Sequence, residues 1–295
     1  MNPREQGFLL LSGKLGDPQR KPLTTAQLRL LSQRALYLEP QDGEPELTLE
    51  HLLSIGLDKD LSERILILLE DKLQLDAYLE KANKNGCVPI TRASSQYPLL
   101  LRKRLGCDAP GCLWVKGDAD ILGMPAISLV GSRGLNSQNR KFAREVGAQA
   151  AKQGYALVSG NARGADSAAQ IACLEAGGCV ISIVADSLAE HSLENNILYV
   201  SEEDFDEPFS VPRALHRNFA IHAWGEITFV AQCTLEKGGT WHGSTQNLRK
   251  KWSPLYCFSD GSPAAAELER MGAVLTGVEP LADFHHFADR QLTFL

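Results

Sequence analysis

The sequence predicts an α/β protein with a mostly parallel sheet, preceded by a small helical module. Two observations lead to this fold class. From Ala126 onward, apolar runs of strand length alternate with helical segments, whereas before residue 86 apolar residues recur at helical spacing. Continuous apolar strands separated by helices are typical of a parallel sheet covered on both faces. The arrangement predicted after Ala126 is therefore an extended Rossmann-like domain.

Residues 1–85 are expected to form the helical module. Apolar residues such as Leu61 and Ile65 share a helical face, and a break rich in Pro and acidic residues falls at 39–45. Segment 52–68 places a Gly turn between two helical stretches, a pattern typical of SAM or helix-hairpin-helix modules. Such a turn could offer backbone N–H groups to a phosphate, but an ordinary helix pair fits this loose pattern better.

Residues 86–125 are predicted to be a connecting segment with one short strand at 112–116, residues 126–280 the Rossmann-like domain, and residues 281–295 a C-terminal tail. The strands expected in the domain span 126–130, 155–159, 179–186, 198–201, 227–233 and 254–259. Helices are expected between them, for example at 137–153 and 167–176. In such sheets ligands bind at the carboxyl ends of the strands.

Composition limits the classes of function. The formal net charge is -6, so a nucleic-acid binder of this sequence needs a local basic patch. The 7 cysteines form no CxxC pair, and their odd number argues against a secreted disulfide framework. No apolar run approaches the ~18 residues of a membrane span, and the N-terminal apolar stretch is too short for a signal peptide. We expect a soluble, cytoplasmic protein without a membrane partner.

Three predicted strand-to-helix turns combine glycine with small polar or basic residues. Glycine allows close backbone approach, Ser132 can donate to a phosphate oxygen, and Arg133 offers a charged fork. The turns contribute these candidate residues: Gly131, Ser132 and Arg133; Ser159, Gly160, Arg163, Gly164 and Asp166; Lys237, Gly238, Gly239 and Thr240. Because all three follow strands of one sheet, they should meet at one edge and form an anion pocket, where each helix N-terminus adds roughly 0.3 to 1 kcal/mol.

Other residues near these turns have less certain roles. A carboxylate beside phosphates is unfavourable, so Asp166 is expected to cap its helix or to orient Arg163 or Arg133. A helix containing Arg217 and Asn218 would point toward the pocket rim. Trp241 and Trp252 could stack on bases, although a Trp more commonly belongs to the core. The basic groups at 140–144 and 249–251 fit solvated helix faces and ends.

The sequence lacks the motifs of several enzyme classes. No GxGxxG follows a strand and no GxxxxGK[ST] is present, which disfavours NAD-linked chemistry and ATP hydrolysis. Neither HExxH nor GxSxG occurs, and the pair His285-His286 is isolated. We therefore expect no catalytic residues, no metal and no cofactor, and a protein that is not an enzyme.

Four segments carry a family resemblance: SLVGSR (128–133), VSGNARGADSAA (158–169), PRALHRN (212–218) and KGGTWHGS (237–244). Over 97–272 the chain resembles the DNA-processing protein A family, DprA or Smf. The resemblance implies binding of single-stranded DNA in a basic pocket, a homodimer, and transfer of DNA to a RecA-type recombinase during recombination or DNA uptake. Carried over by position, the DNA-binding residues are those of the three turns together with Arg217 and Asn218.

The chain departs from the family pattern in several places. Gln170 stands where the family usually has His, Phe219 ends the family's RNR run, and KGGTWHGS replaces a KSGSLIT-like segment. No winged-helix module is expected after the last α/β unit. An alternative is a nucleotide-binding or nucleotide-sensing protein related to the LOG phosphoribohydrolases, although the glutamate of their PGGxGTxxE motif is missing. A scaffold with a vestigial pocket is a third interpretation.

Overall fold

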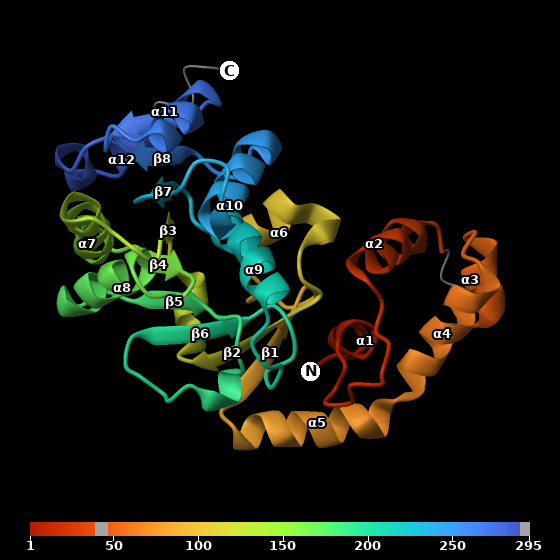
Figure 1. The fold of residues 1–295 in the computed structure, drawn as a ribbon. Coiled ribbons are helices and arrows are strands. Elements are labelled where there is room, and N and C mark those ends of the chain that lie inside the picture. The colour runs from red at the N-terminus through yellow and green to blue at the C-terminus, as the bar shows by residue number, and fades with distance from the viewer. Residues whose placement is uncertain (39–46, 290–295) are drawn as a thin grey trace.

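The computed structural model describes residues 1–38 and 47–289 and contains one nine-stranded sheet (Figure 1). The strands are β1 (Cys87–Thr91), β2 (Cys112–Gly117), β3 (Ala126–Val130), β4 (Ala156–Ser159), β5 (Val180–Ile183), β6 (Ile197–Ser201), β7 (Thr228–Val230), β8 (Leu255–Phe258) and β9 (Val274–Thr276). Their order is β1-β2-β6-β5-β4-β3-β7-β8-β9. In this spatial order, every neighbouring pair from β6 through β5, β4, β3, β7 and β8 to β9 is parallel. The β1-β2 and β2-β6 pairs are antiparallel. The predicted fold class is confirmed.

Helices cover both faces of this sheet. They are α6 (Leu99–Leu105), α7 (Ser137–Lys152), α8 (Ala165–Glu175), α9 (Val211–Trp224), α10 (Gly238–Lys250), α11 (Pro263–Arg270) and α12 (His285–Asp289). One apolar core packs α7 and α8 against residues such as Leu129 and Leu157. The other packs α9 and α11 against residues such as Val130 and Val158, which point to the opposite face. Such double burial explains the continuous apolar strands.

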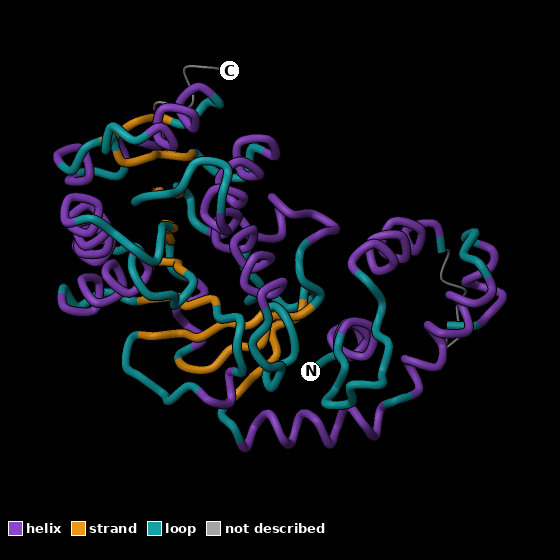
Figure 2. The backbone as a smooth tube through the Cα atoms, in the orientation of Figure 1, coloured by secondary structure: helices purple, strands orange, loops and turns teal. Residues whose placement is uncertain are grey.

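The N-terminal helices lie to one side of the sheet, as Figure 2 shows. They are α1 (Pro3–Ser12), α2 (Thr25–Arg34), α3 (Leu49–Ser54), α4 (Lys59–Glu70) and α5 (Lys72–Lys84). Their own small core includes Leu52, Ile65 and Leu68. Leu9 and Tyr78 instead join the core of the sheet. The module is therefore joined to the α/β part by buried apolar contacts.

The Gly turn between α3 and α4 joins an ordinary pair of helices. The N–H groups of Gly56 and Leu57 donate to carbonyls of α3 at 2.9 and 3.2 Å. Arg34 donates to the carbonyls of Ile55 and Gly56, both at 2.8 Å. These two N–H groups are already bonded, so the turn does not resemble a phosphate site. The break expected at 39–45 lies outside the described residues.

Two expected boundaries need correction. Segment 86–125 is part of the α/β domain and not only a connecting segment. It supplies β1 and β2, and β2 pairs with β6. The sheet thus begins at Cys87, well ahead of Ala126. The start of segment 281–295 is not a free tail either: Leu281, Phe284 and Phe287 are buried in the core, and residues 290–295 lie outside the described part. No helix of the described residues is long and apolar enough to cross a membrane.

Candidate functional site

The three glycine-containing turns meet at one edge of the sheet. They follow β3, β4 and β7, which are adjacent and parallel, so their carboxyl ends point the same way. Helices α7, α8 and α10 follow these turns, and α8 and α10 begin directly at them. The close approach of the first two turns requires glycine at Gly164. Its φ is +93°, and a Cβ there would lie 2.4 Å from the carbonyl oxygens of Ser132 and Arg133.

Two adjoining cavities, which we call the carboxyl-edge pocket, open between these turns and α9. The first has a volume of about 340 Å³ and the second about 450 Å³. Both are lined by Arg133, Ala162, Phe209 and Arg217. The first is also lined by the predicted residues Gly131, Ser132, Asp166, Asn218, Lys237, Gly238, Gly239 and Thr240, and the second by Arg163. A chain of linked phosphates and sugars could pass from one cavity to the other.

Three predicted residues shape the pocket from behind and do not line it. The buried Ser159 hydroxyl accepts a hydrogen bond from Gln170 Nε2 at 2.6 Å. The Gly160 N–H donates to Asp166 Oδ2 at 3.1 Å. Gly164 provides the positive φ just described. Gln170, the departure from the family's usual His, therefore supports the second turn through Ser159.

Asp166 organises the second turn. Its Oδ2 accepts N–H donors from Gly160 at 3.1 Å and Ala162 at 3.2 Å. Burial raises the pKa of Asp166 to about 6, although Arg217, the two N–H donors and Arg133 oppose this rise. The carboxylate thus binds the backbone of the second turn, and the predicted role as a helix cap is wrong, because the start of α8 has no side-chain cap. Among the charged side chains, Arg217 has the largest effect on the pKa of Asp166, larger than that of Arg163 or Arg133. Helix α9 brings Arg217 over the turn.

The basic side chains of the pocket differ in whether they already form hydrogen bonds within the protein. Arg217 donates to the Ile183 carbonyl at 2.9 Å, and burial lowers its pKa while Asp166 opposes that change. Arg133, Arg163 and Lys237 are exposed. Within the described part of the chain, no side-chain hydrogen bond or ion pair is recorded for these three. They are therefore the cations free to meet a ligand.

The third turn presents the start of α10. Lys237 is the N-cap residue, but no side chain caps this end. Unpaired N–H groups at a helix start favour anions. Gly239 lies against α9, because a Cβ there would lie 2.7 Å from Asn218 Nδ2 and the Asn218 side chain would have to move. The start of α10 is therefore uncapped, and Gly238, Gly239 and Thr240 lie on the cavity wall.

One residue that lines both cavities, Phe209, was not predicted from the sequence. Phe209 lines both cavities and is 56% exposed. It lies in the loop between β6 and α9, where no periodicity distinguishes a functional apolar residue from a buried one. Trp241 and Trp252, the two expected stacking candidates, pack against the core, and Trp252 lies 5.4 Å from the Phe219 ring. Phe209 is therefore the exposed aromatic ring of the site.

The remaining chemistry of the site is limited. No group of three or more His, Cys, Asp or Glu residues within the described ranges could hold a metal ion. The basic helix faces noted in the sequence lie outside the pocket lining, and Arg144 forms an ion pair with Glu175 at 2.7 Å. What the pocket offers is backbone N–H groups, exposed cations and one aromatic ring. That combination suits a polyanion with planar bases.

Comparison with known proteins assigns the family. The family model of DNA recombination-mediator protein A matches residues 89–276, from the first strand of the sheet to the last. The chain belongs to the DNA recombination-mediator protein A family. All three turns and α9 lie inside the matched range, as the resemblance of the four sequence segments predicted.

Curated relatives of this family support the assignment. DNA processing protein DprA of Bacillus subtilis is 25% identical over 236 residues, covering 74% of this chain and 77% of the relative. Protein Smf of Escherichia coli is 29% identical over 244 residues, covering 73% of this chain and 61% of the relative. DNA processing protein DprA of Streptococcus pneumoniae is 38% identical over 81 residues, which is 28% of either chain.

Solved DprA structures share the fold. The X-ray structure of Streptococcus pneumoniae DprA matches with a TM-score of 0.70 and 22% identity, covering 95% of this chain and 96% of that one. A Helicobacter pylori DprA structure matches with a TM-score of 0.55 and 21% identity, covering 70% of this chain and 96% of that one. The second structure is described as showing a single-stranded DNA binding mode of that protein.

Proposed function

We propose that this protein binds single-stranded DNA in the carboxyl-edge pocket without catalysing a reaction on it. The observation that carries this proposal is the gathering of Arg133, Arg163 and Lys237 around two adjoining cavities, with no side-chain hydrogen bond or ion pair of these three within the described residues. Backbone N–H groups at the start of α10 add to the attraction for phosphate. Membership of the family and the description of the Helicobacter pylori protein support DNA as the polyanion.

The proposal extends to the biological role. A protein that binds single-stranded DNA through its backbone without consuming it can pass that strand to another protein. We infer that a RecA-type recombinase is the recipient, during recombination or DNA uptake, and that two copies of the chain act together as a homodimer. Family membership supports both inferences. Size-exclusion chromatography with light scattering tests the dimer, and a pull-down with a purified recombinase tests the transfer partner.

The pocket assignment is tested by Arg133→Ala in a fluorescence-anisotropy titration with a labelled oligothymidylate at low salt. Loss of one phosphate contact should weaken binding about tenfold, since charge-assisted hydrogen bonds contribute on the order of 1.5 to 3 kcal/mol. The matched control is Arg249→Ala, an exposed arginine in the last turn of α10, which should bind like the wild type. Equal affinity of both variants would contradict the assignment.

A thermal-shift experiment separates binding of DNA from binding of a free nucleotide. Ligand binding raises the apparent melting temperature by mass action. In a thermal-shift comparison at equal nucleotide concentration, the oligonucleotide should stabilise the wild type more than any mononucleotide does. A larger shift with one mononucleotide would instead support the nucleotide-sensing alternative. No shift with any of these ligands would support a scaffold with a vestigial pocket.

A further inference from the structure

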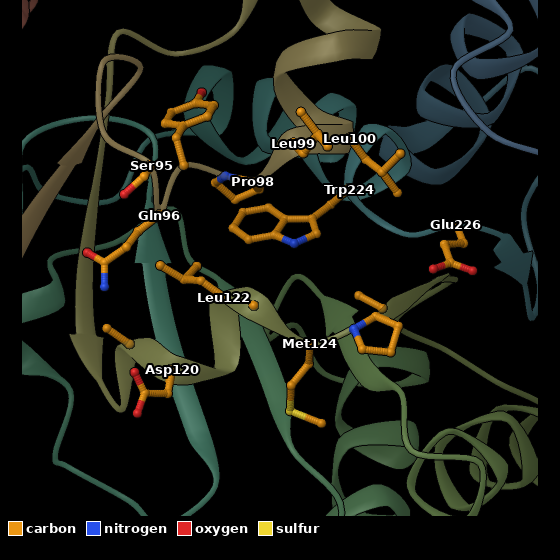
Figure 3. A pocket seen from close by; sticks show the side chains of 15 residues that line it. Ser95, Gln96, Pro98, Leu99, Leu100, Asp120, Leu122, Met124, Trp224 and Glu226 are labelled. Atoms are coloured by element: carbon orange, nitrogen blue, oxygen red, sulfur yellow. The ribbon is translucent and has the colours of Figure 1, made fainter.

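A further cavity lies at the other edge of the sheet (Figure 3). It has a volume of about 510 Å³ and reaches Ala126, the first residue of β3, whereas the carboxyl-edge pocket reaches Val130, the last. The two are separated by the length of the strand, about 13 Å at ~3.3 Å per residue. We call it the amino-edge cavity. Nothing in the proposed DNA-binding function uses it.

The floor of the amino-edge cavity is apolar. Trp224, the last residue of α9, lies across it, with Leu122, Met124 and Pro98 around the ring (Figure 3). Trp224 is 3% exposed and Leu122 8%, so the floor is fixed by packing in the core beneath. The apolar lining residues that a ligand's methylene groups can cover are the more exposed Met124 and Pro125.

The rim of the amino-edge cavity is acidic. Asp120 and Glu226 lie at opposite ends of it, on either side of Trp224 (Figure 3). None of the residues that line it is a lysine or arginine. Among the described residues neither carboxylate forms an ion pair, although the charge of Glu226 opposes the lowering of the Arg104 pKa by burial. The cavity therefore favours a ligand that is positively charged at both ends, and it disfavours phosphates, nucleotides and other anions.

Arg104, which interacts with Glu226, is hydrogen-bonded to the protein backbone. Arg104 donates to the carbonyls of Ala223, Gly225 and Glu226 at 3.1, 2.5 and 3.3 Å. These carbonyls lie at the C-terminal end of α9, where the helix dipole also favours positive charge. Arg104 thus fixes the corner that carries Glu226 and Trp224, and it does not line the cavity.

From this geometry we propose that the amino-edge cavity binds a linear aliphatic diamine or polyamine. The methylene chain would lie on Met124 and Pro125, and the terminal ammonium groups would meet Asp120 and Glu226. A lysine side chain from a partner protein would satisfy only one of the two carboxylates. Two acidic ends joined by an apolar floor therefore favour the diamine over a basic peptide.

Isothermal titration with 1,4-diaminobutane and spermidine, at low ionic strength and without DNA, tests this proposal. The matched monoamine is 1-aminobutane, which keeps the methylene chain and loses one charge. Both amines with two or more charges should bind, and the monoamine should bind about two- to fivefold more weakly, the effect of one exposed ion pair. Because DNA is absent, the outcome is independent of the proposed DNA-binding function.

Two variants locate the ligand. Asp120→Asn and Glu226→Gln should each weaken diamine binding about two- to fivefold and leave monoamine binding less affected. Asp76→Asn on α5 and Glu269→Gln on α11, two exposed acidic residues outside the lining, serve as controls that should bind like the wild type. Absence of measurable binding, equal binding of the monoamine, or equal effects of the control variants would overturn the proposal. So would binding of N-acetyl-lysine methylamide as tight as that of the diamine, which would indicate a protein partner.

Discussion

Asp166 shows how one side chain can hold a binding site together and also oppose its ligand. Its Oδ2 atom accepts hydrogen bonds from both N–H groups of the second turn. Its negative charge lies on the wall of the cavity where phosphates are proposed to bind. Since burial raises its pKa to about 6, the carboxylate is mostly charged at neutral pH and mostly protonated below pH 5. The pocket should therefore become more attractive to phosphates as this group loses its charge.

The variant Asp166→Asn tests that role. An amide oxygen can accept the same two N–H donors, so the turn should keep its shape while the charge is lost. At neutral pH we expect affinity for single-stranded DNA to rise about three- to tenfold, because a like charge several ångströms away costs roughly 1 kcal/mol near a protein surface. Wild-type affinity should also rise as the pH falls through about 6, the pKa of Asp166.

Anisotropy titrations of both proteins across this pH range provide the measurement. The ratio of the two affinities isolates Asp166 from other titrating groups such as His216, whose pKa is raised by Glu202. That ratio should approach one below the pKa. A ratio that stays constant with pH would show that Asp166 does not act on the ligand through its charge.

At the scale of single residues, the sequence predicted the turns better than their partners. Gly131, Ser132 and Arg133 are recognisable because glycine and a basic residue directly follow an apolar strand. The electrostatic interaction of Asp166 with Arg217 was not predicted, since it depends on how α9 crosses the sheet. Phe209 was not predicted either, because a single apolar residue in a loop carries no pattern.

Close packing of α7 on α8 is the element-scale feature that fixes the second turn. A Cβ at Gly147 of α7 would lie 2.0 Å from the Ala169 carbonyl oxygen of α8. Backbone cannot rotate away as a side chain can, so the two helices would have to separate. The start of α8 carries Asp166, and movement of this helix would disturb the pocket.

Gly147→Ala should therefore destabilise the protein although alanine is the better helix former. We expect a loss of about 1 to 3 kcal/mol in the free energy of unfolding, typical of overpacking, measured by urea denaturation. The matched control is Gly7→Ala in α1, where no atom lies within 4 Å of the added Cβ. That change should be neutral or stabilising by up to about 1 kcal/mol. Equal effects of the two variants would contradict the packing argument.

The predicted elements were those with the strongest pattern. Strands β3 to β8 are apolar along their length because both faces are buried, and each was expected close to its observed position. The edge strands β1 and β9 were missed. They carry exposed residues, Val88 at 50% and Val274 at 38%, and β1 contains Pro89, so neither has a continuous apolar run. Helix α1 lies within the predicted helical module, but its own position was not predicted, because its ten residues form too few turns for a clear helical pattern.

Across the whole molecule, the negative net charge and a basic pocket are compatible because the acidic segment just before α9 is paired with basic residues. In the segment 202–207, Glu203 lies 3.4 Å from Arg213, and Glu202 lies 3.5 Å from His216. Asp206 and Glu207 pair with Lys81 and Lys14 of the helical module at 2.7 and 2.9 Å. These pairs tie the module to the sheet. They leave the carboxyl-edge pocket as a local site of positive charge in an acidic chain of net charge -6.

The most direct test of phosphate recognition in this pocket is the salt dependence of oligothymidylate binding. For single strands, the logarithm of the affinity should fall linearly with the logarithm of the salt concentration, with a slope of about -0.7 per phosphate contacted. With two or three phosphates in the two cavities, the wild type should give a slope of about -1.4 to -2.1. Arg133→Ala should make this slope shallower by about 0.7. Binding that does not depend on salt, or an unchanged slope in the variant, would contradict the account.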